Sequence, residues 1–332
     1  MPSVSIVIPT HDRRALLAEA VASALDQRGP EIEVLVVDDA SSDGTAEWLA
    51  GLGEPRVRHW SLRPGRGGSG ARNVGLEHAR AEHVLFLDDD DVLLPGAVAR
   101  LLAALDDNPT AGRALGAYER FGDDVAVSRS IHPDRAMVRS IWREELFRWN
   151  GPPGAILWRA DVVREAGGWD ESRPRGEDTD LNLRAWRHPV AIIPDTVLRY
   201  RYHATQVRLA EYWPIDRRVR EDFIVALPES ERREALRILV AREVFQAGME
   251  HYYDSDFRAA LRCYVSAGRA VPAVFASPVL APWLLRIVGK AAALSMAPRP
   301  AARRVVQRRR AGRFVPDGRR APADGYVLSS QR

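Results

Sequence analysis

The stretch that decides the fold is residues 85–95, which read LFLDDDDVLLP. The apolar run from His83 to Leu87 predicts a buried strand, and four adjacent aspartates follow it, Asp88 to Asp91. Neighbouring carboxylates repel one another, and burying one unpaired is costly. A divalent cation would remove that cost, and oxygen-only ligands suit Mg²⁺ or Mn²⁺, which also recruit substrate phosphates. The alternative is a solvated acidic turn that caps a helix opened by Pro95.

Two other strands near the amino terminus also end in polar residues. The first covers residues 4–8 (VSIVI) and the second residues 32–37 (IEVLVV). The second strand ends at Asp38 and Asp39, and the first at Pro9, Thr10, His11 and Asp12. Alternating strands and helices predict a parallel sheet, and such sheets bind ligands at the carboxyl ends of their strands. We therefore expect the three polar clusters to meet at one edge of the sheet.

Hydrophobic periodicity extends this pattern along the chain. Strands are predicted near residues 4–8, 32–37, 56–60 and 83–87, and helices near 13–26, 43–52, 70–80 and 95–106. Further strands are predicted at 115–118, 125–130, 155–158 and 190–193, with a helix at 178–187. From about residue 211 the pattern is helical. Residues 241–270 predict one two-helix hairpin of tetratricopeptide type, packed through Tyr252, Phe257, Ala260 and Leu261.

The order of short motifs resembles that of glycosyltransferase family 2, whose members have the GT-A fold and use nucleotide-sugar donors. The matching segments span roughly residues 3–205 and read VSIVIPTHDR, VLVVDDASSDGT, GSGARNVGLEHA, FLDDDDVLLP, GGWDE, GEDTDL and YRYH. Each is weak alone, and their order and spacing make the signal specific. The resemblance implies an α/β fold of GT-A type, which is a Rossmann-like, mostly parallel central sheet flanked by helices, with a C-terminal helical extension.

The expected domain organisation follows from this resemblance and from composition. Residues 1–210 are expected to form the catalytic domain, with a nucleotide-sugar-binding half at 1–110 and an acceptor-side half at 111–210. Residues 211–298 are expected to form a helical region. Residues 299–332 are expected to form a basic, flexible tail, because they contain ten Arg and only two Asp.

The resemblance also assigns roles to individual residues. Asp88, Asp89 and Asp90 match the family's Asp-x-Asp motif, which implies Asp90 as the direct metal ligand and Asp88 as a ligand nearer the ribose. Four consecutive aspartates leave this register open by one residue. His203 is implied as a further metal contact. The residues implied in nucleotide-sugar binding are Pro9, Thr10, His11, Asp12, Asp39, Arg72, Asp88 and Asp89, with Asp39 accepting the uracil N–H. Family members often have an aromatic residue and Asn where this chain has His11 and Asp12.

Transfer of a sugar also needs a base for the acceptor hydroxyl, and the resemblance assigns that role to Asp178, with Glu177 and Trp169 on the acceptor side. A carboxylate within hydrogen-bond reach is a competent general base, whereas the alternative role of Asp178 is helix capping. One base without a second nucleophile predicts inversion at the anomeric carbon. The implied activity is Mn²⁺- or Mg²⁺-dependent transfer of one sugar, from a UDP-sugar in the first instance, to a glycan or a lipid-linked saccharide.

Two other functions compete with this interpretation. Residues Gly65–Gly70 satisfy the G-x-G-x-x-G pattern of NAD-dependent oxidoreductases. However, that fingerprint belongs after the first strand, and the segment before it here, residues 56–60, is polar. A catalytically inactive nucleotide- or carbohydrate-binding module is the second competitor. The presence of both the acidic turn and Asp178 argues against a loss of catalytic activity.

The composition of the chain indicates where the protein is located and which partners it has. The single cysteine, Cys263, suits a reducing compartment and is expected to be a small buried residue in a helix. No signal peptide is expected before the first strand. Prolines and charges interrupt the apolar segment 271–297, which predicts a buried helical hairpin, or a segment on a membrane surface, rather than a spanning helix. The expected location is cytoplasmic, with peripheral contact of the basic tail with anionic lipid at the inner face of a bacterial membrane. Nucleic acid is not an expected partner, because interleaved aromatics are lacking.

Overall fold

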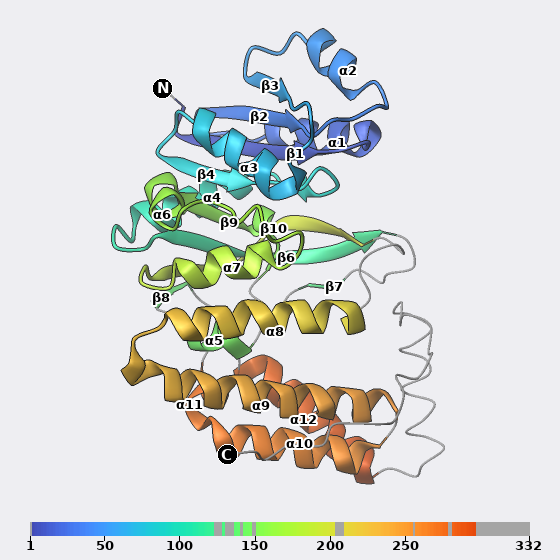
Figure 1. Cartoon of the computed structure of the whole chain (residues 1–332), viewed down its shortest axis with the longest axis vertical. Coiled ribbons are helices and arrows are strands. Elements are labelled where there is room, and N and C mark those ends of the chain that lie inside the picture. Colours follow the sequence, from blue (N-terminus) through green and yellow to red (C-terminus); the bar gives the residue numbers. More distant parts are fainter. Residues whose placement is uncertain are drawn as a thin grey trace.

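The structure is a computed structural model that describes residues 2–122, 128–129, 136–139, 142–147, 151–202, 209–254, 256–277 and 281–296. Along its long axis a sheet domain occupies one end and a group of helices the other (Figure 1). Within the described residues the sheet has ten strands in the order β3-β2-β1-β4-β9-β6-β10-β5, with β7 paired to β6 and β8 to β10. The α/β fold with a helical C-terminal extension is therefore confirmed.

The amino-terminal half forms the parallel part of the sheet. Its strands are β1 (Val4–Thr10), β2 (Ile32–Asp38), β3 (Val57–Ser61) and β4 (His83–Phe86), all paired in parallel. The helices that connect and follow them are α1 (Arg14–Leu25), α2 (Thr45–Gly51), α3 (Gly67–His78) and α4 (Ala97–Asp106). Helix α3 crosses β1 at Gly75, where a Cβ would come within 2.2 Å of a Val7 methyl carbon, so only glycine allows this approach.

Antiparallel strands make the second half of the sheet mixed. The strands are β5 (Val92–Leu93), β6 (Arg113–Gly122), β7 (Ser128–Arg129), β8 (Met137–Arg139), β9 (Ile156–Arg159) and β10 (Val190–Tyr202). Strand β9 lies antiparallel between β4 and β6, whereas β6 and β10 are parallel. The short helices here are α5 (Trp142–Phe147), a 3₁₀ turn at Pro153–Ala155, α6 (Ala160–Glu165) and α7 (Glu177–Arg184).

The carboxyl-terminal helices are α8 (Leu209–Ala226), α9 (Glu229–Tyr253), α10 (Phe257–Ala270), α11 (Pro272–Phe275) and α12 (Ala281–Met296). The predicted hairpin over residues 241–270 is formed by α9 and α10, and α9 already begins at Glu229. These helices share a hydrophobic core with α5 and α7, which contribute Trp142, Phe147 and Leu183. Because sheet-domain helices enter this core, the domain boundary at residue 210 stays a prediction.

Several sequence expectations are corrected by the structure. The helix expected from residue 95 begins at Ala97, with Gly96 in a left-handed conformation at its N-cap, so Pro95 does not open it. The strand expected at 190–193 continues to Tyr202. Of the strand expected at 125–130, only Ser128–Arg129 lies within the described residues. Cys263 is in α10 as expected, although only half-buried.

The apolar segment 271–297 forms α11 and α12. Val271, Val274 and Ala291 are buried, whereas Leu285 is 72 % exposed. The prediction that this segment is buried is therefore confirmed for only part of it. No helix among the described residues is both long and apolar enough to cross a bilayer.

Candidate functional site

The polar ends of β1, β2 and β4 meet at one edge of the sheet, as their sequence predicts. Strand register places Thr10 beside Asp38, and the Thr10 hydroxyl donates a 2.7 Å hydrogen bond to Asp89. The register therefore joins the three strand ends, and the Thr10 bond ties the acidic turn after β4 to the end of β1.

The four aspartates of the acidic turn have separate roles. Asp88 and Asp90 are only partly buried, with side chains 27 % and 13 % exposed. Asp89 is more buried, and burial raises the pKa of its carboxyl to about 6 despite the hydrogen bond from Thr10. Asp91 is fully buried and accepts a 2.8 Å hydrogen bond from the Arg201 backbone N–H. Asp91 thus fastens the turn to β10.

Burial disfavours negative charge on the carboxyl groups of the turn. It raises the pKa of Asp91 well above its ordinary value, with a further contribution from Asp88 and Asp90. The pKa of Tyr200 is also raised, first by burial and then by Asp91. One Asp91 oxygen, Oδ2, finds no hydrogen-bond partner among the described residues.

Arginine side chains supply part of the missing positive charge. Arg13, at the start of α1, donates to Asp89 at 3.2 Å and to Asp90 at 2.9 Å. Arg13 is not among the predicted site residues, although it directly follows the polar residues at the end of β1. It is half-exposed, whereas its two partners are largely buried. Arg13 therefore holds the two carboxylates together from the solvent side.

The donor chemistry of the turn fits a hard dication. Within the described ranges there is no ready-made group of three or more His, Cys, Asp or Glu ligands. Mg²⁺ and related ions need only one or two carboxylates when phosphates and water complete the shell. Asp91 accepts the Arg201 N–H and Asp89 accepts the Thr10 hydroxyl. Asp88 and Asp90 are bound by Arg72 and Arg13, and these two carboxylates stay the predicted ligands of such an ion.

A buried arginine joins the acidic turn to the start of α7. Arg72 in α3 is 7 % exposed, and it donates to Asp88 at 2.7 Å and to Glu177 at 3.3 Å. Its guanidinium lies over the Trp169 ring, 4.6 Å from the ring centre. Charge pairing on both sides raises the pKa of Arg72 although burial opposes it. The side chain is therefore a fixed cation between two carboxylates.

Trp169 supports this arrangement from the core. Its ring is 3 % exposed and packs edge-on against Phe86, with ring centres 5.0 Å apart. Asn73 fixes the Trp169 backbone through hydrogen bonds to its N–H and its carbonyl oxygen. Because the ring faces Arg72, we infer that it positions this arginine, and its acceptor-side role stays a prediction.

Helix α7 places Glu177 and Asp178 at this edge. Gly176 is its N-cap and has a φ of +76°, which favours glycine. The N-cap is Gly176, and Asp178 lies within the first turn, where its Oδ1 accepts the Thr179 backbone N–H at 2.7 Å. Asp178 therefore also satisfies an N–H at the start of the helix, and its role as a base stays a prediction. Burial raises the pKa of Glu177 to about 7, the Asp178 charge adds to this, and Arg72 opposes it. Both carboxylates therefore lie in the same electrostatic environment as Asp88.

The raised pKa of Glu177 predicts a pH-dependent stability. A carboxyl whose pKa is raised on folding stabilises the fold below its ordinary range, and this contribution is lost as the pH rises through about 7. Glu177→Gln should therefore gain thermal stability relative to the parent protein between pH 5 and pH 8. Glu171→Gln is the control, because hydrogen bonds from Asn73 and Arg66 lower the pKa of Glu171. A Glu177→Gln difference that is constant with pH would contradict the prediction.

The expected base pocket has a different arrangement of hydrogen bonds. The Asp39 carboxylate accepts backbone N–H groups of Arg66 at 2.6 Å and Gly67 at 2.8 Å. A ring nitrogen of His11 lies 2.6 Å from the Asp39 carbonyl oxygen, so this nitrogen must be the donor. Asp12 has a φ of +52° and accepts the Ser42 N–H, which lowers the pKa of its carboxyl. The role of Asp39 toward a base stays a prediction.

The same hydrogen bonds weaken the oxidoreductase alternative. The glycine pattern at residues 65–70 follows β3, which is the edge strand of the sheet. Two of its N–H groups are bound to Asp39, and a Cβ on Gly65 would lie 3.1 Å from an Asp39 oxygen. The side chain of Arg66 is held by Glu171 at 2.6 Å. The loop is thus built to pack on Asp39 and Glu171.

The predicted residues Thr10, Asp39, Arg72, Asp88, Asp89, Asp90, Glu177 and Asp178 all lie along this edge, with Trp169 beneath it. Pro9 is buried at the end of β1. His203 lies outside the described residues.

Comparison with known proteins identifies a family match in the first half of the chain. Residues 5–160 match the model of a family described as glycosyl transferase family 2. The chain is 38 % identical over 106 residues to the succinoglycan biosynthesis protein ExoO of Rhizobium meliloti, which covers 32 % of this chain and 30 % of that protein. It is 38 % identical over 105 residues to the GalNAc(5)-diNAcBac-PP-undecaprenol beta-1,3-glucosyltransferase of Campylobacter jejuni, covering 31 % and 34 % of the two chains.

The fold is similar to a solved structure over nearly its whole length. The first 349 residues of TarS from S. aureus, in complex with UDP-GlcNAc, superpose with a TM-score of 0.62 at 19 % identity, covering 94 % of this chain and 93 % of that one. Fold and site thus define an α/β domain with an acidic turn at the carboxyl edge of its parallel strands. Residues 5–160, just under half of the chain, match a domain of glycosyl transferase family 2. It spans less than two thirds of the length of these curated relatives.

Proposed function

We propose that this protein transfers one sugar, with inversion, from a nucleoside-diphosphate sugar to a glycan or a lipid-linked saccharide. A UDP-sugar is the first candidate donor. One observation carries the proposal, which is that Arg72 joins Asp88 of the acidic turn to Glu177, the neighbour of Asp178. A site for a leaving diphosphate and a candidate base therefore share one edge of the sheet.

The residues divide the chemistry between them. Asp178 takes the proton of the acceptor hydroxyl while the acceptor oxygen bonds to the anomeric carbon and the bond to the diphosphate breaks. Arg72 orients Asp88 and Glu177, and Arg13 holds Asp89 and Asp90. A bound Mg²⁺ or Mn²⁺, held by Asp88 and Asp90, would neutralise charge on the leaving diphosphate.

The comparisons support the classes of donor and acceptor. The TarS structure contains UDP-GlcNAc, and the name of the Campylobacter relative describes a glucosyltransferase with a pyrophosphate-linked undecaprenol saccharide. We extend the proposal to peripheral contact with the inner face of a bacterial membrane, since a lipid-linked acceptor is presented there. The basic residues after position 298 support this contact by their charge.

A calorimetric screen of UDP-, dTDP- and GDP-sugars, with and without Mn²⁺, tests the proposal together with turnover of a labelled donor. We expect a UDP-sugar to bind more tightly with Mn²⁺ and to be consumed when a saccharide acceptor is added. Binding without turnover on any acceptor would favour the inactive binding module. Binding of NAD in place of sugar nucleotides would contradict the proposal.

A further inference from the structure

The charge of the chain changes abruptly at Asp256. Residues 1–256 contain 33 Arg and 43 Asp or Glu, so this part is net negative. Residues 257–316 contain eleven Arg and one Lys, and neither Asp nor Glu. This second stretch begins with α10 and continues through α12. This stretch, unlike α8 and α9 before it, therefore carries only positively charged side chains, which attract anionic surfaces.

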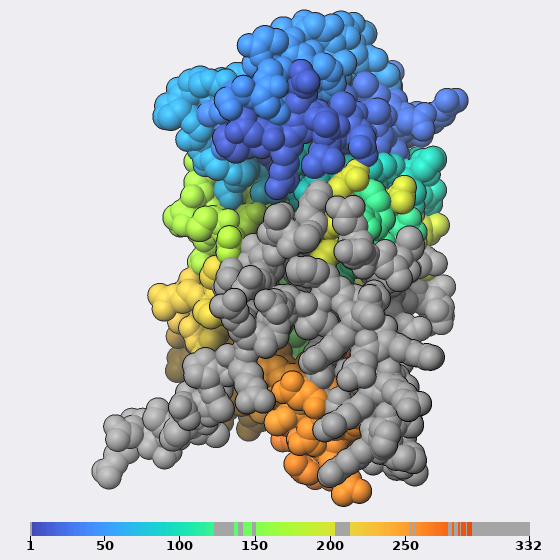
Figure 2. Space-filling model, turned by 90° about the vertical axis from the view of Figure 1, so that its right-hand side faces the viewer, coloured from blue at the N-terminus to red at the C-terminus, as the bar shows by residue number. Residues whose placement is uncertain are grey.

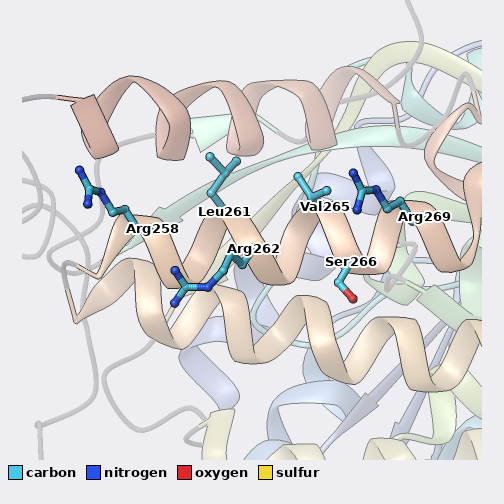
Figure 3. A pocket seen from close by; sticks show the side chains of 6 residues that line it. All are labelled: Arg258, Leu261, Arg262, Val265, Ser266 and Arg269. Carbon is cyan, nitrogen blue, oxygen red and sulfur yellow. The ribbon is translucent and has the colours of Figure 1, made fainter.

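Part of this charge lies in a groove on α10. Six α10 side chains line it, and its volume is about 540 Å³ (Figure 3). They are Arg258, Leu261, Arg262, Val265, Ser266 and Arg269. The three arginines are exposed, and none forms an ion pair with a carboxylate within the described part of the chain. Their positive charge is therefore available to a partner.

The groove is not required to hold α10 in place. The opposite face of the helix packs into the core through Phe257, Ala260, Tyr264 and Ala267. Aliphatic side chains are also exposed here, with Val265 in the groove at 40 % and Leu285 on neighbouring α12 at 72 %. A surface that combines arginines with exposed aliphatic side chains suits the boundary of a bilayer, where cations meet phosphates and apolar groups enter the acyl region.

We propose that the α10 groove is a docking surface for an anionic lipid bilayer, with Arg258, Arg262 and Arg269 contacting headgroup phosphates. This inference rests on the membrane contact proposed above and identifies its surface. Nucleic acid fits less well, because none of the six lining side chains is an aromatic platform for bases. Helix α10 lies at the end of the long axis opposite β1–β3 (Figures 1 and 2), so docking leaves the nucleotide edge of the sheet accessible.

Sedimentation of the full chain with phosphatidylglycerol and phosphatidylcholine vesicles tests the proposal. The parent protein should bind phosphatidylglycerol vesicles, with an affinity that falls as salt is added. The variant Arg258→Glu/Arg262→Glu should bind them about 100-fold more weakly. The control is Arg233→Glu/Arg237→Glu, which makes the same charge change at the same spacing on an exposed face of α9. It should keep the parent affinity to within about threefold. Val265→Ser should also weaken binding, without any change of charge.

The outcomes separate this inference from the proposed enzymatic function. Parent-like binding by the α10 variant, or an equal loss in both double variants, would overturn the groove as the docking surface. Lack of preference for phosphatidylglycerol, or tighter binding of a single-stranded RNA than of vesicles at the same salt, would do so too. Both double variants should transfer sugar to a soluble acceptor at the parent rate. If the parent protein transfers no sugar in that assay, the enzymatic proposal is contradicted, whereas the result with vesicles is unaffected.

Discussion

Asp178→Asn should lower turnover by a factor of about 10² to 10⁴ and leave donor binding unchanged. The amide has nearly the shape of the carboxylate, but it cannot take the proton of the acceptor hydroxyl. Asp178 lies in the first turn of α7, beside Glu177, and its charge contributes to the raised pKa of that neighbour. Initial rates at saturating donor and acceptor, with donor affinity from calorimetry, measure the two effects separately.

Asp180→Asn is the matched control on the same helix. The Asp180 carboxylate forms ion pairs with two guanidinium groups, that of Arg184 at 2.6 Å and that of Arg173 at 3.4 Å. Asp180 therefore has a structural role. Its replacement should lower thermal stability and preserve turnover. Parent-like turnover of Asp178→Asn would show that the base has been assigned to the wrong residue. Equal loss in both variants would point to damage to α7 instead.

The meeting of polar strand ends was predictable because it depends on local information. Alternating strands and helices fix parallel pairing, and parallel strands bring their carboxyl ends to one edge. The sequence therefore predicted that Thr10, Asp38 and the acidic turn would be neighbours, and the register confirms it. Arg72 and Glu177 were also named in advance, although their bridge spans more than a hundred residues and depends on the packing of α3 against Trp169.

Other features depend on contacts that no local pattern reveals. Strand β10 was expected to stop at Ile193. In the structure it shifts register between Ile192 and Thr196 and continues beside β6. This continuation brings the Arg201 N–H to Asp91. The ambiguity among the four aspartates could therefore be addressed only once the partner strand was known.

Because the Arg201 N–H binds Asp91, Asp90 is the residue whose replacement tests the metal site. Asp90→Ala should abolish the gain in donor affinity that Mn²⁺ provides, a loss of about 10- to 100-fold. The reason is that Asp90 is one of two carboxylates in the turn that suit a cation and its phosphates. Arg13 would keep its hydrogen bond to Asp89, so the turn should remain folded. Titration of Mn²⁺ by electron paramagnetic resonance, with and without UDP, measures metal binding independently of turnover.

Asp91→Asn distinguishes the two registers of the acidic turn. The Asn side-chain oxygen can still accept the Arg201 N–H, and the substitution removes a fully buried carboxylate whose pKa is raised by burial. This variant should therefore keep Mn²⁺-dependent donor binding. If instead Asp91→Asn loses that dependence and Asp90→Ala retains it, the metal ligand lies one residue further along the chain. Asp91 could then not serve as the fastening to β10, because its carboxylate would have to leave the core to reach the ion.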